Sequence, residues 1–179
     1  GPGGLYDTSV YPEDQTGSIG IALEIGAVSH NITESQFGLA SVRPRWNVSG
    51  SYQQVIPRYL STDSDGNGER DFLTEYFPDM ETMTGAIFRK GYQWPFDPRK
   101  IAGFGSSLID LAVYQETVLR GRRVFLDFMH NPSGGGGFAA FDVSIIPSEA
   151  GDYLSRSKAM GATPIERLAS LNRKSIDLY

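Results

Sequence analysis

The stretch 93–132 constrains the fold of this chain more than any other part of its sequence. It contains a loop rich in Pro, Gly, Arg and Lys, then a long apolar segment, a basic turn and a short run of β-branched and aromatic residues. Apolar residues at helical spacing over 108–119 predict a helix, and their number predicts that it is buried on most sides. The residues at 124–128 predict a strand. We therefore expect a charged loop held against a rigid support, as in many binding sites.

The two ends of the expected helix carry local signals. Ser107 and Asp110 have the spacing of a capping box, in which a hydroxyl accepts a free backbone N–H and a carboxylate lies at the positive helix end. Gly121 predicts the C-terminal end, because glycine adopts the left-handed conformation without a Cβ penalty. Leu111 falls inside the apolar arc, whereas Glu116 is among the few side chains left for water. If Leu111 is buried, its replacement by alanine should cost ~2–5 kcal/mol.

Length and composition limit the classes of protein to which the chain can belong. With 179 residues, 40% of them apolar, it is long enough for one domain with a real core. Its formal net charge of −5 provides no general attraction for phosphate backbones, so we expect no nucleic acid partner. Because the chain has no cysteine, disulfides and thiolate metal sites are excluded. No apolar run reaches the ~18 residues that a membrane span needs, so we expect no span.

The rest of the chain contains both helical and strand patterns. Strand patterns occur over 28–32, 37–42 and 52–60, the last interrupted by Pro57, which indicates an edge or a bend. Helical patterns occur over 16–27, 69–77, 78–90 and 148–160. A further helix through Leu171 follows Thr163-Pro164-Ile165-Glu166, a capping box with proline at the first helical position. We expect an α+β fold, in which several helices pack on a small mixed or antiparallel sheet.

Two other segments have less regular patterns. The glycines at 134–137 predict a flexible loop, because glycine loses the most conformational entropy when it is ordered. Lys174 begins an alternating apolar pattern that runs to the last residue and predicts a strand over 174–179.

The segment 63–68 has oxygen-bearing side chains at alternate positions. Asp63, Asp65 and Asn67 match the first, third and fifth positions of a calcium-binding loop. The bidentate glutamate of that motif is missing, since Thr74 stands at its position. A surface turn closed by side-chain-to-backbone hydrogen bonds is the alternative, and it is the interpretation that we favour.

Other motifs for catalysis or cofactor binding are incomplete. Gly103-Phe104-Gly105 lacks the third glycine of the dinucleotide-binding fingerprint, and the chain has no phosphate-binding P-loop motif. His30 and His130 are far apart and lack ligand spacing, so we expect surface or capping roles for both. A hydrolase triad is therefore unsupported.

Several short motifs in the first part of the chain occur in an order typical of one known family. They are Gly3-Gly4-Leu5-Tyr6, Thr16-Gly17, Gly20-Ile21-Ala22-Leu23, Gly26-Ala27, Glu34 and Gln36-Phe37. This order resembles the stretch of the fumarate reductase and succinate dehydrogenase flavoprotein family that leaves the flavin domain and enters the capping domain. The segments 66–73 and 107–128 resemble later parts of that capping domain, and 175–179 resembles the return to the flavin domain.

The resemblance implies that the chain is the capping domain of an FAD-dependent oxidoreductase, with a capping-domain-like fold. Residues 1–27 would be the lead-in from the flavin domain, with 1–2 left from a tag, 28–173 the capping domain and 174–179 a return strand. FAD would belong to the parent protein, and we expect none bound to this piece and no activity from it alone. The implied partners are the flavin-binding domain of the same parent chain and a small organic acid. We expect a cytoplasmic location.

The resemblance also assigns site residues. In the family an arginine of the capping domain donates a proton to substrate, but counting back from Gly121 places Ser107 at that position. The nearest guanidinium is that of Arg99, which becomes the implied catalytic residue, with substrate-binding roles for Lys100, Ser106 and Ser107. The family's substrate-binding histidine is missing, because Gly38 follows Gln36-Phe37.

The residues around Arg99 support the same role by a separate argument. Lys100 is adjacent, and the glycines at 103 and 105 allow a loop to close, so that the Arg99 guanidinium could clamp a carboxylate with two hydrogen bonds. A surface arginine paired with Asp97 is the alternative. For the whole chain, the alternative function is a free-standing, calcium-dependent binding module without catalysis.

Overall fold

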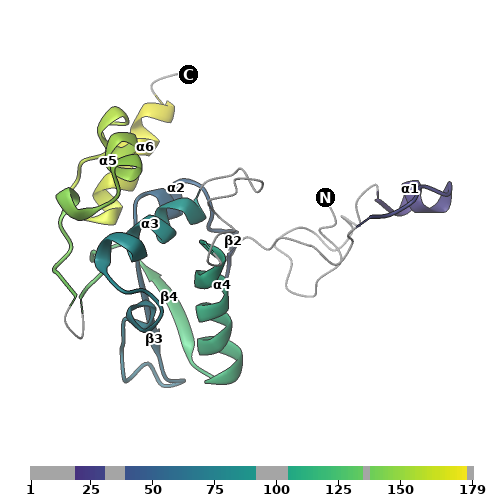
Figure 1. Ribbon diagram of the computed structural model, residues 1–179, viewed down its shortest axis with the longest axis horizontal. Coiled ribbons are helices and arrows are strands. Elements are labelled where there is room, and N and C mark those ends of the chain that lie inside the picture. The colour runs from purple at the N-terminus through teal and green to yellow at the C-terminus, as the bar shows by residue number, and fades with distance from the viewer. Residues whose placement is uncertain (1–18, 31–38, 92–104, 135–137, 177–179) are drawn as a thin grey trace. The chain divides into compact units, whose positions relative to one another are not determined.

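The computed structural model describes residues 19–30, 39–91, 105–134 and 138–176. Over these residues the fold is α+β, with several helices and two antiparallel sheets of two strands each (Figure 1). The chain divides into two compact units, residues 1–48 and 49–179. The expected α+β class with antiparallel pairing is therefore confirmed. The glycine-rich segment 135–137, predicted to be a flexible loop, lies outside the described residues.

The first unit contains a short helix and a small hairpin. Helix α1 spans Ile19–Glu24, inside the helix expected over 16–27. Strands β1 (Ala40–Val42) and β2 (Arg45–Asn47) pair antiparallel, which confirms the last residues of the strand expected over 37–42. The strand expected over 28–32 is wrong at 28–30, where the backbone is in no strand. Of the residues 20–30, 39–44 and 46–48, whose exposure the structure describes, none is buried.

The sheet of the second unit is formed by two strands from distant parts of the sequence. Strand β3 (Arg58–Thr62) pairs antiparallel with β4 (Arg123–Asp127), so that Leu60 faces Phe125 across the pair. The strand predicted at 124–128 is thus confirmed within one residue. The strand predicted over 52–60 is wrong in its first half, because Ser51–Gln54 forms helix α2 and β3 begins only after Pro57.

Helix α3 (Met80–Lys90) runs through the core of the second unit. The Asp79 side chain caps it by accepting a hydrogen bond from the Thr82 amide at 2.7 Å. Seven of its eleven residues are buried, with Met80, Met83, Ile87 and Phe88 forming the apolar side. The apolar stripe that the sequence shows in this segment is therefore core packing.

The helix expected over 69–77 does not form. Only the short 3₁₀ turn η2 (Phe72–Glu75) is helical, with Phe72 and Leu73 buried. Arg70 instead forms a backbone bridge with Ser61, with N···O distances of 2.9 and 3.0 Å. This pairing holds the segment extended beside β3, and helix formation is thereby prevented.

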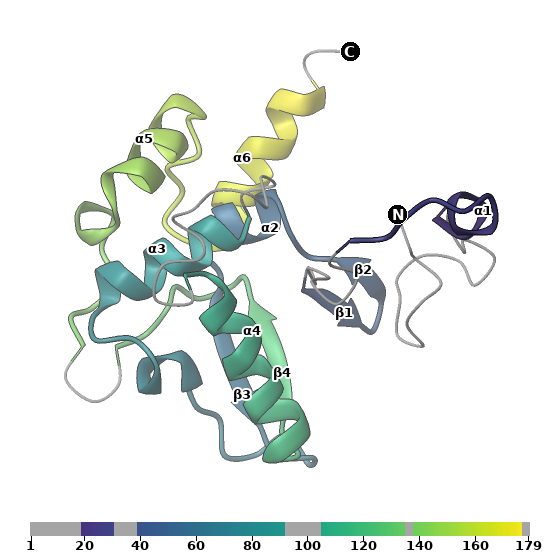
Figure 2. The same ribbon diagram turned by 45° about the vertical axis from the view of Figure 1, so that its right-hand side comes forward.

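The segment expected to be a buried helix consists of α4 (Ser107–Tyr114) followed by a π-helical turn, η5 (Gln115–Leu119). It runs alongside the β3–β4 pair in both views (Figure 1 and Figure 2). Burial on most sides is wrong: only Ile109, Ala112 and Glu116 are buried, and Leu111 is 50% exposed. Gly121 ends the segment with φ +64°, as predicted.

The capping box expected at Ser107 is also wrong. Ser106 is the N-cap residue, and no side chain caps the helix. Ser107 is the first helical residue. Asp110 instead ion-pairs with Lys90 at the end of α3, so its carboxylate ties two helices together. The Asp110 carboxylate therefore makes a tertiary ion pair and does not take part in capping its own helix.

Two helices complete the second unit, joined to the sheet through the short 3₁₀ turn η6 (Val143–Ile145). Helix α5 (Ser148–Arg156) confirms most of the helix expected over 148–160, and α6 spans Pro164–Ile176. At the start of α6 the Thr163 amide donates to Glu166 Oε2 at 3.2 Å, one half of the predicted capping box. The predicted strand 174–179 is wrong at 174–176, which continue the helix.

Arg167 fixes α6 to the rest of the unit. Its side chain is fully buried and donates to the carbonyls of Val55 at 3.0 Å and Gly161 at 3.1 Å, and to Asn131 Oδ1 at 2.8 Å. Burial lowers the pKa of Arg167 to about 10, which leaves it cationic at neutral pH. Because its donors are bonded to oxygens on separate segments, the buried Arg167 guanidinium links α6 to those segments.

Candidate functional site

A polar cleft of about 420 Å³ lies beside strand β3 in the second unit. Most of its wall comes from the chain between the 63–68 turn and the end of η2. Its lining residues are Arg58, Glu69, Arg70, Asp71, Thr74, Glu75 and Phe138. The bridge between Ser61 and Arg70 positions this wall, because it fixes the backbone at Arg70, one of the lining residues.

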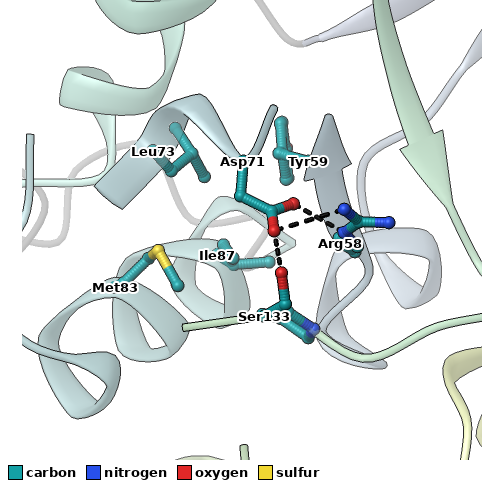
Figure 3. A pocket seen from close by; sticks show the side chains of 8 residues that line it. Arg58, Tyr59, Asp71, Leu73, Met83, Ile87 and Ser133 are labelled. Carbon is teal, nitrogen blue, oxygen red and sulfur yellow. Dashed lines mark hydrogen bonds and ion pairs between the residues drawn. The ribbon is translucent and has the colours of Figure 1, made fainter. Parts of the chain in front are cut away.

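One side of the cleft is an ion pair between Arg58 and Asp71. Nε of Arg58 donates to Asp71 Oδ1 at 2.5 Å, and Nη2 donates to Oδ2 at 3.2 Å. The Ser133 hydroxyl also donates to Asp71 (Figure 3). Behind the pair lies a cavity of about 10 Å³, lined in part by Leu73, Met83 and Ile87. Its size corresponds to roughly one water molecule.

The electrostatics of this pair depend on its surroundings. Burial raises the pKa of Asp71, as do the negative charges of Glu69 and Asp127, and these effects outweigh the lowering by Arg58. For Arg58, burial lowers the pKa, but hydrogen bonds and charges from Asp71 and Glu69 raise it further than burial lowers it. Arg58 therefore stays cationic and serves several carboxylates at once, including Asp127 at 3.6 Å.

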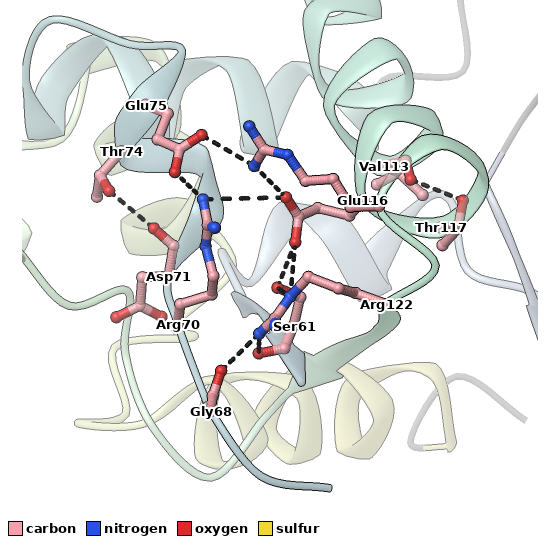
Figure 4. A network of polar contacts seen from close by, with 11 residues as sticks. Ser61, Gly68, Arg70, Asp71, Thr74, Glu75, Val113, Glu116, Thr117 and Arg122 are labelled. Carbon is pink, nitrogen blue, oxygen red and sulfur yellow. Dashed lines mark hydrogen bonds and ion pairs between the residues drawn. The ribbon is translucent and has the colours of Figure 1, made fainter. Parts of the chain in front are cut away.

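The other side of the cleft is connected to a buried carboxylate, Glu116 (Figure 4). Glu116 is fully buried; its Oε2 accepts from the Ser61 hydroxyl at 2.5 Å, and its Oε1 accepts from Arg120 Nη1 at 2.6 Å. Arg122 Nε lies 3.1 Å from Oε2. Glu75, at the cleft wall, pairs with both Arg70 and Arg120. The cleft and the end of the α4–η5 segment thus share one network of ion pairs.

Opposing effects act on the pKa of Glu116. Burial alone raises it, but hydrogen bonds from Ser61 and Arg120 and the charges of Arg70 and Arg120 lower it more, so the net shift is downward. The group is therefore a fixed anion at neutral pH. A carboxylate held ionised in this way suits structural organisation better than proton transfer near pH 7.

Of the site residues predicted from the sequence, the structure describes two and leaves two outside its described ranges. Arg99 and Lys100 lie outside the described residues. Ser106 is buried and Ser107 is exposed. Neither serine lines the polar cleft, so the structure does not bring the described part of the predicted site to it.

The 63–68 segment is a surface turn, as favoured from its sequence. Asp63 Oδ1 accepts the amides of Asp65 at 3.0 Å and Asn67 at 2.7 Å. The Gly66 amide donates to the Asp63 carbonyl, and Gly66 has φ +89°. Across the described ranges, no group of three or more His, Cys, Asp or Glu side chains could hold a metal ion. The bond to the Asp65 amide, two residues on, has the pattern of an Asx turn, and the bond to the Asn67 amide closes the loop further.

Both histidines are exposed, as expected. His130 Nδ1 lies 2.8 Å from Asp127 Oδ2, at the end of β4. The hydrogen bond to His130 and those from nearby amides lower the pKa of Asp127, against the opposite and largest effect of burial. After β4 the Asp127 carboxylate accepts the amides of Met129 and His130, and His130 is a surface residue, the first of the two predicted roles.

The residues that line the cleft were missed from sequence because their roles are non-local. Asp71 was assigned to a helix, and Glu116 was expected to face water. One signal was present: the charged residues Glu69, Arg70 and Asp71 follow the turn at 63–68, so a chain reversal there would bring them back beside the preceding strand. The bridge between Ser61 and Arg70 brings Asp71 to Arg58, and the position of η5 beside β3 brings Glu116 to Ser61.

Comparison of the chain with protein-family models, with curated proteins and with solved structures finds no match. Among the helices that the structure describes, none is both long and apolar enough to cross a membrane. Chemically, the cleft presents fixed charges of both signs, because Arg58 and Arg70 each face carboxylates.

Proposed function

We propose that the chain is the capping domain of an FAD-dependent oxidoreductase of the fumarate reductase and succinate dehydrogenase type, which closes over a small organic acid at the flavin. The sequence resemblance supports this proposal along most of the chain. The helix, Gly121 and strand of the 107–127 segment form in the order that the resemblance implies. FAD is assigned to the flavin-binding domain, since Gly103-Phe104-Gly105 lacks the dinucleotide fingerprint.

The observation that carries the proposal is the uncovered apolar surface of the first unit. Its exposed side chains include Ile21 at 66%, Ile25 at 81% and Val28 at 95%. Trp46 in the hairpin is 59% exposed. Large apolar side chains left exposed in this way are typical of a surface that contacts another protein. A lead-in from a flavin domain would be covered by that domain.

The helical segment α4–η5 presents a second uncovered apolar face. Leu111, Tyr114 and Val118 are each at least half exposed and follow helical spacing. They lie opposite the inward residues Ile109, Ala112 and Glu116. In the proposed parent protein this face is a second surface for the flavin-binding domain.

The proposed chemistry divides between the cofactor and this chain. FAD, when bound, supplies the hydride transfer. Arg99 donates a proton to the substrate or clamps its carboxylate, and Lys100, Ser106 and Ser107 bind the acid. A proton donor of such high intrinsic pKa works only in a closed, dry site, so closure of the cap is part of the proposal.

The test is made in the longer parent protein. Its flavin content is measured first, because a parent without flavin would contradict the whole proposal. Arg99→Gln and Arg99→Lys should then lower turnover by orders of magnitude with normal flavin content, since neither side chain presents the same fork of donors. Arg156→Gln, at an exposed arginine of α5, is the matched control and should leave turnover unchanged.

Two further outcomes would distinguish the role of Arg99 from the capping function, and the capping function from its alternative. Turnover of the Arg99 variants within about threefold of the parent, a change well under 1 kcal/mol, would remove Arg99 from the mechanism and leave the capping role intact. Tight calcium binding at the 63–68 turn, measured by calorimetry on the chain alone, would instead favour a free-standing binding module.

A further inference from the structure

The buried carboxylate of Glu116 needs an explanation beyond stability. Removing a charge from water is costly, and buried ion pairs often stabilise a fold no better than apolar residues of the same volume. Glu116 also lies in a π-helical turn, a geometry that is rare and frequently found at functional sites. Its burial in this turn, with several hydrogen bonds, therefore points to a positional role.

The contacts of Glu116 join three separate segments. Through Ser61 it holds strand β3, whose residue 61 pairs with Arg70 at the start of the cleft wall. Through Arg120 it is tied to Glu75, at the other end of the wall. Both ends of the 70–75 segment are thus linked to one carboxylate.

Arg122 strengthens the same connection. Its Nη2 donates to the Ser61 carbonyl at 3.0 Å and also to the Gly68 carbonyl, which closes the 63–68 turn. Its Nε donates to the Ser61 hydroxyl at 3.0 Å and lies beside Glu116. Arg122 itself follows the π turn, and its amide donates to the Glu116 carbonyl at 2.8 Å. The turn, the strand and the helix end are therefore cross-linked around Glu116.

We propose that Glu116 couples the wall of the polar cleft to the C-terminal end of the α4–η5 segment, so that the two open and close as one unit. The coupling is carried by the ion pairs and hydrogen bonds through Ser61, Arg120 and Arg122, which meet on this carboxylate (Figure 4). It is independent of the function proposed above.

The experiment is hydrogen exchange, followed by mass spectrometry, on the full 179-residue chain. Glu116→Gln should speed exchange by at least about tenfold in two segments together, 61–75 and 115–122, because both lose the same anchor. Exchange in α6, which Arg167 holds independently, should stay as in the unmodified chain. Glu81→Gln, an exposed glutamate on α3, is the matched control and should change neither segment.

A milder variant keeps the proposal testable if Glu116→Gln does not fold. Ser61→Ala removes the hydroxyl's hydrogen bond to the carboxylate and the bond that this hydroxyl accepts from Arg122 Nε. The ion pairs of Arg120 and Arg122 with Glu116 remain, so exchange in the same two segments should speed up by a smaller factor. Faster exchange confined to 115–122, or an equal increase throughout the chain, would overturn the coupling. The first result would mean a local helix contact only, and the second a general loss of stability.

Discussion

Helices α3 and α4 make the most instructive comparison in this molecule. The sequence of α4 is mostly apolar, yet only two of its eight residues are buried. The sequence of α3 mixes Met, Thr, Gly and charged residues, yet seven of its eleven residues are buried. Apolar content alone therefore does not predict which helix lies in the core.

The difference follows from what surrounds each helix. Helix α3 packs against α2 and α4, and its Phe88 ring meets Tyr153 of α5 at 5.4 Å. Helix α4 runs along the β3–β4 pair, where its inner residues Ile109 and Ala112 are covered. A sheet of two strands covers only one side of a helix, so the outer side of α4 stays open.

Replacement of Phe88 by alanine should have the largest effect on stability. The ring is 1% exposed, so its loss leaves a cavity in the centre of the second unit. We expect a loss of ~3–5 kcal/mol in the free energy of unfolding, measured by urea denaturation. A loss below about 1 kcal/mol would show that α3 is not the core helix and would reverse the comparison.

Glu116, the one buried charged residue of the α4–η5 segment, should make the stability of the chain depend on pH in the acid range. The pKa of Glu116 is lowered from 4.5 in the folded chain, so its ionised form adds stability that is fully present above that value. This stability is lost as pH falls through the folded pKa. Urea unfolding between about pH 6 and about pH 3 should therefore show a steeper acid loss for the unmodified chain than for Glu116→Gln.

The difference between the two chains isolates Glu116, because the other carboxylates titrate in both. Asp110, in the same helix, should contribute with the opposite sign: burial raises its pKa more than Lys90 lowers it. Equal acid slopes for the unmodified chain and Glu116→Gln would show that the Glu116 network adds no stability to the folded state.

Replacement of Leu111 by alanine should have the smallest effect. Leu111 is half exposed, so we expect a change of about 0.5 kcal/mol in the free energy of unfolding, well below the cost of a buried leucine. Ile109→Ala, two residues earlier on the covered side, is the matched comparison and should cost ~2–5 kcal/mol. Similar losses at the two positions would mean that both sides of α4 are covered in the chain as it exists in solution.

The elements predicted correctly from sequence depend on neighbouring residues. Gly121 ends its segment because its own backbone can adopt positive φ. The α6 start needs only the Thr163 amide and Glu166, three residues apart. Strand β4 was predicted from its own aromatic and β-branched residues, which favour the extended backbone of a strand.

The errors share a different cause. The first half of the predicted strand 52–60 became α2, and the predicted helix 69–77 was reduced to a 3₁₀ turn. In the second case the decisive contact joins Ser61 with Arg70 across the 63–68 turn. The residue pattern within 69–77 does not reveal that pairing, because the pairing depends on where strand β3 lies.

The sequence by itself determined the α+β class, the starts of α5 and α6, the end at Gly121 and the surface turn at 63–68. The local ones among these depend on bonds that close within a few residues. Only the tertiary structure decided which helix is buried and how the charged residues group. Glu116 meets Ser61 and Arg58 meets Asp127 through the β3–β4 register, which joins strands more than sixty residues apart. The attraction between such charges depends on their separation and on the dielectric constant around them. Both are set only when the strands have paired.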